Sequence, residues 1–133
     1  MSGYPDSYYA ATAVGTHDHE PLSEMLRADV CVIGGGFTGL STALNLAEQG
    51  IDVVLLEAER IGFGASGRCG GMLGRGQRWA AVEMASRFGL ETAQAFWLFA
   101  EAANAEIRDR VANHAIDCDL QYGLLEGIHK RRY

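Results

Sequence analysis

The chain has 133 residues, of which 17 are acidic and 11 are lysine or arginine, and its formal net charge at neutral pH is −6. This length suits one domain with a core of its own, and the acidic balance provides no basic footprint for nucleic acid. Because the sequence contains no apolar run long enough for a membrane span, no secretory leader and no C-x-x-C spacing among its three cysteines, it predicts a soluble cytoplasmic protein.

Residues 1–27 are mostly polar, and this composition predicts an N-terminal arm on a domain of residues 28–133. We expect Tyr8 and Tyr9 to anchor the arm and residues 21–26 to form one turn of helix. Two histidines of the arm alternate with acids, but an i, i+2 pair in a polar loop without further ligands does not predict a metal site. The alternating residues are His17, Asp18, His19 and Glu20.

Two short apolar runs, residues 28–33 and 51–56, flank a helical stretch, residues 40–49, that Gly50 ends. Runs of this kind are typical of strands that are buried on both faces. Two strands joined by one helix form a parallel βαβ unit. The sequence therefore predicts an α/β fold that begins with a Rossmann-like unit.

The turn between the first strand and the helix has the spacing Gly34-x-Gly36-x-x-Gly39. The first glycine allows a tight turn, the second leaves room for a pyrophosphate, and the third lets the helix pack close to the strand. The helix start offers free N–H groups and a positive dipole end to phosphates. Glu57, 18 residues after Gly39, is placed to accept hydrogen bonds from an adenosine ribose. The pattern predicts an ADP-binding unit; the alternative is an ordinary glycine-rich turn followed by a solvated acid.

A second glycine-dense stretch, residues 62–76, follows the second strand and carries Arg68 and Arg75, with Arg78 just beyond it. A loop that lies against an anionic ligand needs small residues and inward-facing N–H groups. We therefore favour a ligand-facing loop over a slack linker.

Helical patterns cover residues 78–88 and 91–113, with Gly89 between them, and a short strand or hairpin is predicted at 116–126. The longer helix carries an apolar stripe that we assign to the core. The basic residues at 129–133 are expected to form a solvated tail. The stripe consists of Phe96, Phe99, Ala100, Ala103, Ile107 and Val111, widened by Trp97 and Leu98.

Residues 7–11, 28–57, 60–68 and 116–119 resemble the start of flavoprotein amine and amino-acid oxidases of the D-amino-acid oxidase and glycine oxidase type. The resemblance is most specific to bacterial gamma-glutamylputrescine oxidases and covers residues 7–126. It implies a role in putrescine catabolism, FAD as cofactor, an amine or amino acid as substrate, and oxidation of a C–N bond by hydride transfer to the flavin. It implies FAD contacts from Gly34, Gly36, Phe37, Thr38, Gly39, Glu57 and Ala58, and from Gly64, Ala65, Ser66, Gly67, Arg68, Cys69 and Gly70.

The chain departs from the family pattern at Cys69 and Met72, where Asn and Gln are usual, and it lacks the substrate-binding sheet and the later FAD-domain segments. We expect Cys69 to act as a small uncharged residue and not as a covalent flavin attachment. The fold is therefore predicted to be a partial FAD-binding domain of one βαβ unit, a glycine-rich loop and two helices. The expected function is that of an FAD-dependent oxidoreductase fragment that is unable to catalyse alone, with no catalytic residue assigned. The alternatives are a stand-alone NAD or ADP-ribose binding module, and a remnant that has neither activity nor ligand or that works only when a separate chain supplies the missing half.

Overall fold

The computed structural model describes residues 3–15, 19–74, 77–123 and 125. The chain divides into two compact units, residues 1–74 and residues 75–133. The first unit contains α1 (Tyr8–Thr12), β1 (Val30–Ile33), α2 (Phe37–Glu48), β2 (Val53–Leu56) and the 3₁₀ turn η1 (Ser66–Arg68). The second contains α3 (Ala81–Phe88) and α4 (Leu90–Asn113).

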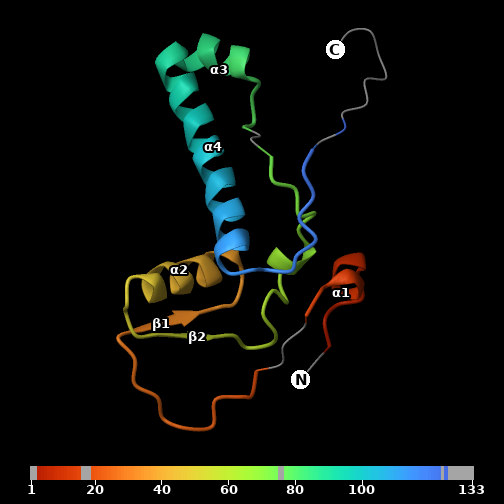
Figure 1. Cartoon of the computed structure of the whole chain (residues 1–133), viewed down its shortest axis with the longest axis vertical. Helices are drawn as coiled ribbons and strands as arrows, with labels where there is room; N and C mark the ends of the chain where they lie inside the picture. The colour runs from red at the N-terminus through yellow and green to blue at the C-terminus, as the bar shows by residue number, and fades with distance from the viewer. Residues whose placement is uncertain (1–2, 16–18, 75–76, 124, 126–133) are drawn as a thin grey trace. The chain divides into compact units, whose positions relative to one another are not determined.

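The strands of the first unit pair in parallel, with Val30 opposite Val53 and Ile33 opposite Leu56. The connecting helix α2 packs against both strands (Figure 1). This arrangement confirms the predicted order of strand, helix and strand in a mixed α/β fold. The two strand ends that carry Ile33 and Leu56 therefore lie side by side at the edge where the glycine turn begins.

Helix α2 begins at Phe37, one turn before the predicted start, and its first amide donates to the Ser66 hydroxyl. At its other end the Gly50 amide donates to the Ala47 carbonyl at 2.9 Å and the Ile51 amide donates to the Leu46 carbonyl at 3.1 Å. This pair of bonds is the Schellman ending that satisfies the last carbonyls of a helix. The predicted stop at Gly50 is confirmed.

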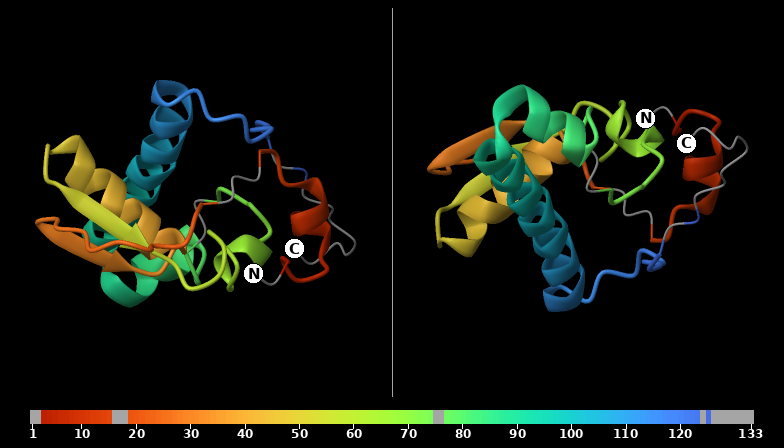
Figure 2. Two further views of the ribbon diagram at one scale, coloured as in Figure 1. Left: turned by 90° about the horizontal axis from the view of Figure 1, so that it is seen from below. Right: turned by 90° about the horizontal axis from the view of Figure 1, so that it is seen from above.

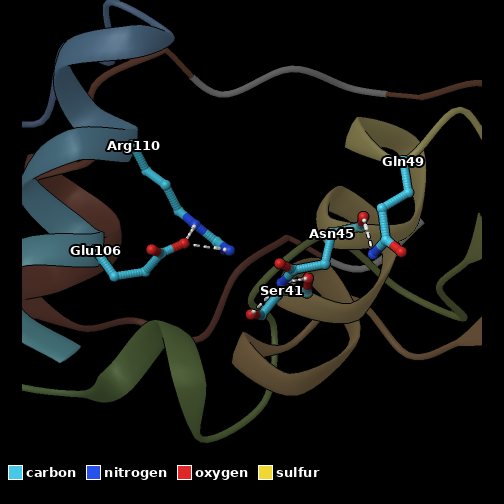
Figure 3. Close-up of polar contacts among 5 residues, drawn as sticks. All are labelled: Ser41, Asn45, Gln49, Glu106 and Arg110. Carbon is cyan, nitrogen blue, oxygen red and sulfur yellow. Dashed lines mark hydrogen bonds and ion pairs between the residues drawn. The ribbon is translucent and has the colours of Figure 1, made fainter. Parts of the chain in front are cut away.

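Polar side chains of α2 bond back to the carbonyls of the preceding turn (Figure 3). The Asn45 amide nitrogen donates to the Ser41 carbonyl at 2.7 Å, and the Gln49 amide nitrogen donates to the Asn45 carbonyl at 2.9 Å. Ser41, Asn45 and Gln49 are all exposed. The helix therefore presents a polar face opposite the apolar residues that pack on the sheet.

Burial alternates along β1, where Val30 and Val32 are half-buried while Cys31 and Ile33 are exposed. A Cβ built at Gly39 of α2 would lie 3.5 Å from Val32, so the half-buried face is the one that α2 covers. Ile33 is 86% exposed. The prediction that this strand is buried on both faces is therefore wrong, because a single helix covers a single face of a two-stranded sheet.

The arm contains a helix that no sequence pattern predicted. Helix α1 follows Ser7, whose hydroxyl accepts a hydrogen bond from the Ala10 amide at 3.2 Å in a normal N-cap. The predicted helical turn at 21–26 is wrong, since this segment is irregular and exposed. One turn of helix is marginal without an apolar surface to pack on. His17 and Asp18 of the alternating acid and histidine pattern lie outside the described residues.

In the second unit α3 and α4 pack against each other and are joined through Gly89 alone. Met84 of α3 is 5% exposed and lines an apolar cavity of about 250 Å³ with Trp79 and Trp97. Helix α4 carries an i, i+4 ion pair at 2.8 Å between Glu106, whose side chain is exposed, and Arg110, whose side chain is largely buried (Figure 3). None of the helices in the described parts of the chain has both the length and the apolar character that a membrane crossing requires.

The apolar stripe of α4 is largely exposed, and its assignment to a core is wrong. Phe99 is 72% exposed, and Phe96, Trp97, Leu98 and Ile107 are also exposed. A hairpin of two helices buries only a narrow stripe on each, so it cannot cover an apolar surface of this width. Helix α3 begins three residues after the predicted position, at Ala81.

The predicted strand at 116–126 is also wrong for the residues described in that range, which are irregular. Asp119 has φ +50° and Ala115 has φ +49°, and neither value belongs to extended backbone. The predicted basic tail at 129–133 lies outside the described residues, as does Arg75.

Candidate functional site

The glycine turn leaves the sheet directly from the ends of the two strands. The Gly34 amide donates to the Leu56 carbonyl at 2.7 Å, and Gly34 has φ +105°, a value that side chains disfavour. A Cβ added at Gly39 would overlap the carbonyl oxygen of Gly34. The first turn of α2 therefore packs on the backbone of the turn itself, and both positions require glycine.

The N-terminus of α2 faces a hydroxyl from the second glycine-dense stretch. Gly36 precedes the helix and provides no side-chain cap. The Phe37 amide instead donates to the Ser66 hydroxyl at 3.0 Å, and a Cβ added at Gly36 would lie 2.9 Å from that oxygen. The cradle in front of the helix therefore has no side-chain bulk from Gly36, and the Ser66 hydroxyl lines it at that position.

The carboxylate of Glu57 closes the other side of the turn. One oxygen accepts from the Gly35 amide at 2.6 Å, and the other accepts from the Glu59 amide at 3.1 Å. The amide of Gly35, and then that of Glu59, holds the pKa of the Glu57 carboxyl below its usual value. Each oxygen of a carboxylate offers more than one lone pair, so Glu57 retains acceptor capacity for a ligand hydroxyl.

Ile61 and Gly62 join the two glycine-rich segments. The Gly62 amide donates to the Gly35 carbonyl at 2.9 Å, and a Cβ added at Gly35 would lie 2.6 Å from Cδ1 of Ile61. This contact was not predicted from the sequence. The available signal was Ile61 itself, an apolar residue directly before the second glycine stretch.

The second stretch folds into a hydrogen-bonded turn that ends in η1. The Gly67 amide donates to the Gly62 carbonyl at 3.0 Å, and a Cβ added at Gly67 would overlap that carbonyl oxygen. The Arg68 guanidinium donates to the carbonyls of Gly64 and Phe63 at 3.2 and 3.1 Å. In this structure Arg68 therefore braces its own loop.

Six of the predicted site residues form the glycine turn or contact it, and most of the others are exposed. Ala58, Gly64, Ala65, Cys69 and Gly70 are exposed, as is Thr38 on the first turn of α2. Arg78 belongs to the second unit, where its guanidinium lies 5.5 Å from the centre of the Trp79 ring. The six joined residues are Gly34, Gly36, Phe37, Gly39, Glu57 and Ser66.

This arrangement fits the adenosine and diphosphate part of a dinucleotide. Because Gly36 has no Cβ, the side-chain group beside it is the Ser66 hydroxyl, whose O–H can donate to a phosphate at the helix N-terminus, and the positive dipole end of the helix attracts anions. The carboxylate of Glu57 is suited to the hydroxyls of a ribose. The site therefore offers binding and orientation, and no residue in it is assigned as an acid, base or nucleophile.

Comparison with known proteins agrees with this chemistry. Residues 29–131 match the family described as FAD dependent oxidoreductase. The chain is 45% identical to gamma-glutamylputrescine oxidoreductase of Escherichia coli over 92% of its own length and 29% of that relative. It is 43% identical to probable oxidoreductase OrdL of Rhizobium meliloti over 93% of its length and 29% of that protein.

A third relative matches only about half of the chain. It belongs to the anaerobic glycerol-3-phosphate dehydrogenase of Haemophilus influenzae, and it is 46% identical over 46% of this chain and 11% of its own length. No solved structure shows a significant match. Neither the family nor these relatives support the alternative of an NAD or ADP-ribose module. The chain spans less than a third of the length of these relatives. Because the family match extends over most of its residues, the chain belongs to the FAD dependent oxidoreductase family.

Proposed function

We propose that residues 28–133 form part of an FAD-binding domain, preceded by the arm of residues 1–27, and that the turn at Gly34–Gly39 holds the ADP half of FAD. The observation that carries this proposal is the cradle before α2, which has no Cβ at Gly36, a helix N-terminus behind it and the Glu57 carboxylate beside it. The family is FAD-dependent, which supports FAD over other dinucleotides.

The roles of the predicted site residues follow from this placement. The Gly36 amide and the Ser66 hydroxyl, which already accepts from the Phe37 amide, would donate to the diphosphate, and Glu57 would accept hydrogen bonds from the ribose. Residues 64–70 would line the path from the diphosphate toward the flavin. Bound FAD would supply the redox chemistry by accepting a hydride, while this part of the protein binds and orients it.

For the reaction we propose oxidation of a C–N bond in an amine or amino acid by the complete enzyme. The support is the 45% identity to gamma-glutamylputrescine oxidoreductase, together with the resemblance at residues 7–11 and 60–68. The complete enzyme would use a small amine substrate, and its substrate pocket would draw on segments that correspond to the rest of the relatives' length.

The experiment measures FAD binding by the 133-residue chain through equilibrium dialysis, with ADP as competitor. The variant Gly36→Val places a side chain in the path of the phosphates, whereas within the protein its Cβ meets only the movable Ser66 side chain. We expect wild-type protein to bind FAD, ADP to displace it, and Gly36→Val to lose measurable binding with an unchanged circular dichroism spectrum.

The matched control is Gly3→Val, because a Cβ at Gly3 meets nothing within 4 Å and the residue lies in the arm. This variant should bind FAD as the wild type does. Equal FAD affinity in Gly36→Val and wild type would contradict the assignment of the turn, and binding that ADP does not displace would contradict the assignment of the ADP half.

A further inference from the structure

Tyr4 of the arm contacts Arg60 and Ile61, the two residues directly before the second glycine-dense stretch. The Tyr4 hydroxyl donates to the Ile61 carbonyl at 2.8 Å, across 57 residues of sequence. The Arg60 guanidinium lies 5.5 Å from the centre of the Tyr4 ring, within the range of a cation–π contact. Two independent contacts therefore hold Tyr4 against residues 60 and 61, which begin the loop of residues 60–68.

Helix α1 follows Tyr4 in the chain and also contacts residues 61–68. Helix α1 lies beside η1 in both views of Figure 2, and the two elements are in contact. A cavity of about 130 Å³ separates the arm from the loop, with Tyr9 and Ala10 on one side and Phe63 and Gly67 on the other. Residues 4–13 therefore contact the same loop that carries Ser66.

The residue that Tyr4 holds is also the residue that supports the glycine turn. The side chain of Ile61 fills the space beside Gly35, and its neighbour Gly62 donates to the Gly35 carbonyl at 2.9 Å. The amide of Gly35 in turn donates to Glu57. A short chain of direct contacts thus runs from Tyr4 through Ile61 to the groups that would hold the ADP moiety.

We propose that Tyr4 is a positioning residue, which holds residues 60–68 against the glycine turn so that Glu57 and Ser66 are in place before a dinucleotide arrives. Preorganisation of this kind reduces the conformational entropy that binding would otherwise cost. The consequence for FAD rests on the proposed function, whereas the ordering of the loop by Tyr4 does not.

The test is native-state amide exchange by NMR on the free 133-residue chain, with Tyr4→Phe as the variant. This change removes the hydroxyl and keeps the ring. The probes are the amides of Gly62 and Gly67, which donate to the carbonyls of Gly35 and Gly62 respectively. We expect both amides to exchange about fivefold faster in Tyr4→Phe, the factor that corresponds to one lost hydrogen bond. Amides in the interior of α2 and in α4 should keep their wild-type rates.

The matched control is Tyr8→Phe, because Tyr8 is 76% exposed on α1. It should leave every probe at the wild-type rate. Unchanged exchange at Gly62 and Gly67 in Tyr4→Phe would overturn the proposal, and so would equal acceleration at all amides, because that result describes a general loss of stability. The variant Tyr4→Leu, which also removes the ring, should accelerate the same two amides further.

A second readout connects the loop to the cofactor. In equilibrium dialysis Tyr4→Phe should raise the Kd for FAD about fivefold, while Tyr8→Phe leaves it unchanged. A wild-type chain that binds no FAD would contradict the proposed function and leave the exchange experiment to decide the role of Tyr4. Wild-type binding with an unchanged Kd in Tyr4→Phe would contradict the role of Tyr4 alone.

Discussion

Glu57 has two partners before any ligand binds, the amides of Gly35 and Glu59. Both bonds favour the charged form of the side chain, which is why its pKa lies below the usual value. The same carboxylate is the group proposed to receive the ribose. Its role in the free protein is therefore to hold the turn in the geometry that the ligand needs.

The lowered pKa of Glu57 predicts a pH-dependent contribution to stability. A carboxyl whose pKa is lower in the folded state stabilises the fold at pH values above its unfolded pKa. That contribution is lost as the pH falls through the folded pKa. We expect wild type to have a higher urea midpoint than Glu57→Gln at neutral pH, and the difference to shrink as the pH falls below the ordinary range for a glutamate.

Urea titrations of both proteins across this pH range measure the effect. The control is Glu24→Gln, at an exposed position of the arm, which should leave the midpoint of the wild type unchanged throughout. A difference between wild type and Glu57→Gln that grows toward acid pH would contradict the assigned contacts.

Among the elements, the second glycine stretch has two glycines with opposite requirements. A Cβ at Gly67 would overlap the Gly62 carbonyl, while a Cβ at Gly64 meets nothing within 4 Å. We expect Gly67→Ala to destabilise the chain by about 2 kcal/mol, because the overlap forces the backbone of the loop to move. Gly64→Ala should stay within about 0.5 kcal/mol of the wild type, as exposed substitutions usually do. Urea unfolding of the two variants measures this, and equal stability would show that Gly67 does not pack on the Gly62 carbonyl.

The strand, helix and strand of residues 30–56 could be predicted from sequence because their signals are local. Two apolar runs and the glycine Gly50 suffice for the order and for the end of α2. The start of α2 at Phe37 could be predicted only to within one turn, since its first amide is satisfied by Ser66, which is 29 residues away in the chain. Helix α1 has only five residues, and the hydroxyl of Ser7 is its main local signal.

The candidate site was predictable to the extent that it follows a spacing. The glycines and Glu57 belong to one motif, so their proximity could be expected. The contacts of Ile61 with Gly35 and of Tyr4 with Ile61 follow no local pattern, and the second of them spans 57 residues. The stripe of α4 was assigned to a core because it is apolar. An apolar helix face indicates that the helix packs against a partner, but the sequence of the helix does not show whether that partner lies in the same chain.

The chain combines the proposed site for part of a cofactor with much apolar surface that its described elements do not cover. Ile33 and the stripe on α4 are exposed, and the chain spans 29% of gamma-glutamylputrescine oxidoreductase. Catalysis by a flavin enzyme requires a shaped pocket around the flavin and the substrate as well as a site for ADP. The proposed site at the glycine turn would supply the site for ADP but not the pocket around the flavin and the substrate.

We therefore expect the 133-residue chain to have no amine oxidase activity. Purified protein with FAD and gamma-glutamylputrescine should form hydrogen peroxide no faster than FAD alone, as measured by a coupled peroxidase assay. The positive control is the Escherichia coli relative under the same conditions. Peroxide formation above the flavin blank, abolished by Gly36→Val, would contradict this expectation.

The bonds that bring Tyr4, Gly35, Glu57 and Ser66 together all lie within residues 4–68. Proteins are made from the N-terminus, and the parts that emerge first can fold first. The ribosome thus releases the proposed adenosine-nucleotide cradle before either helix of the second unit has emerged. Loading of the cofactor can on this basis begin during translation, and a stalled nascent chain with residues 1–74 outside the ribosome should retain labelled FAD while its Gly36→Val counterpart does not.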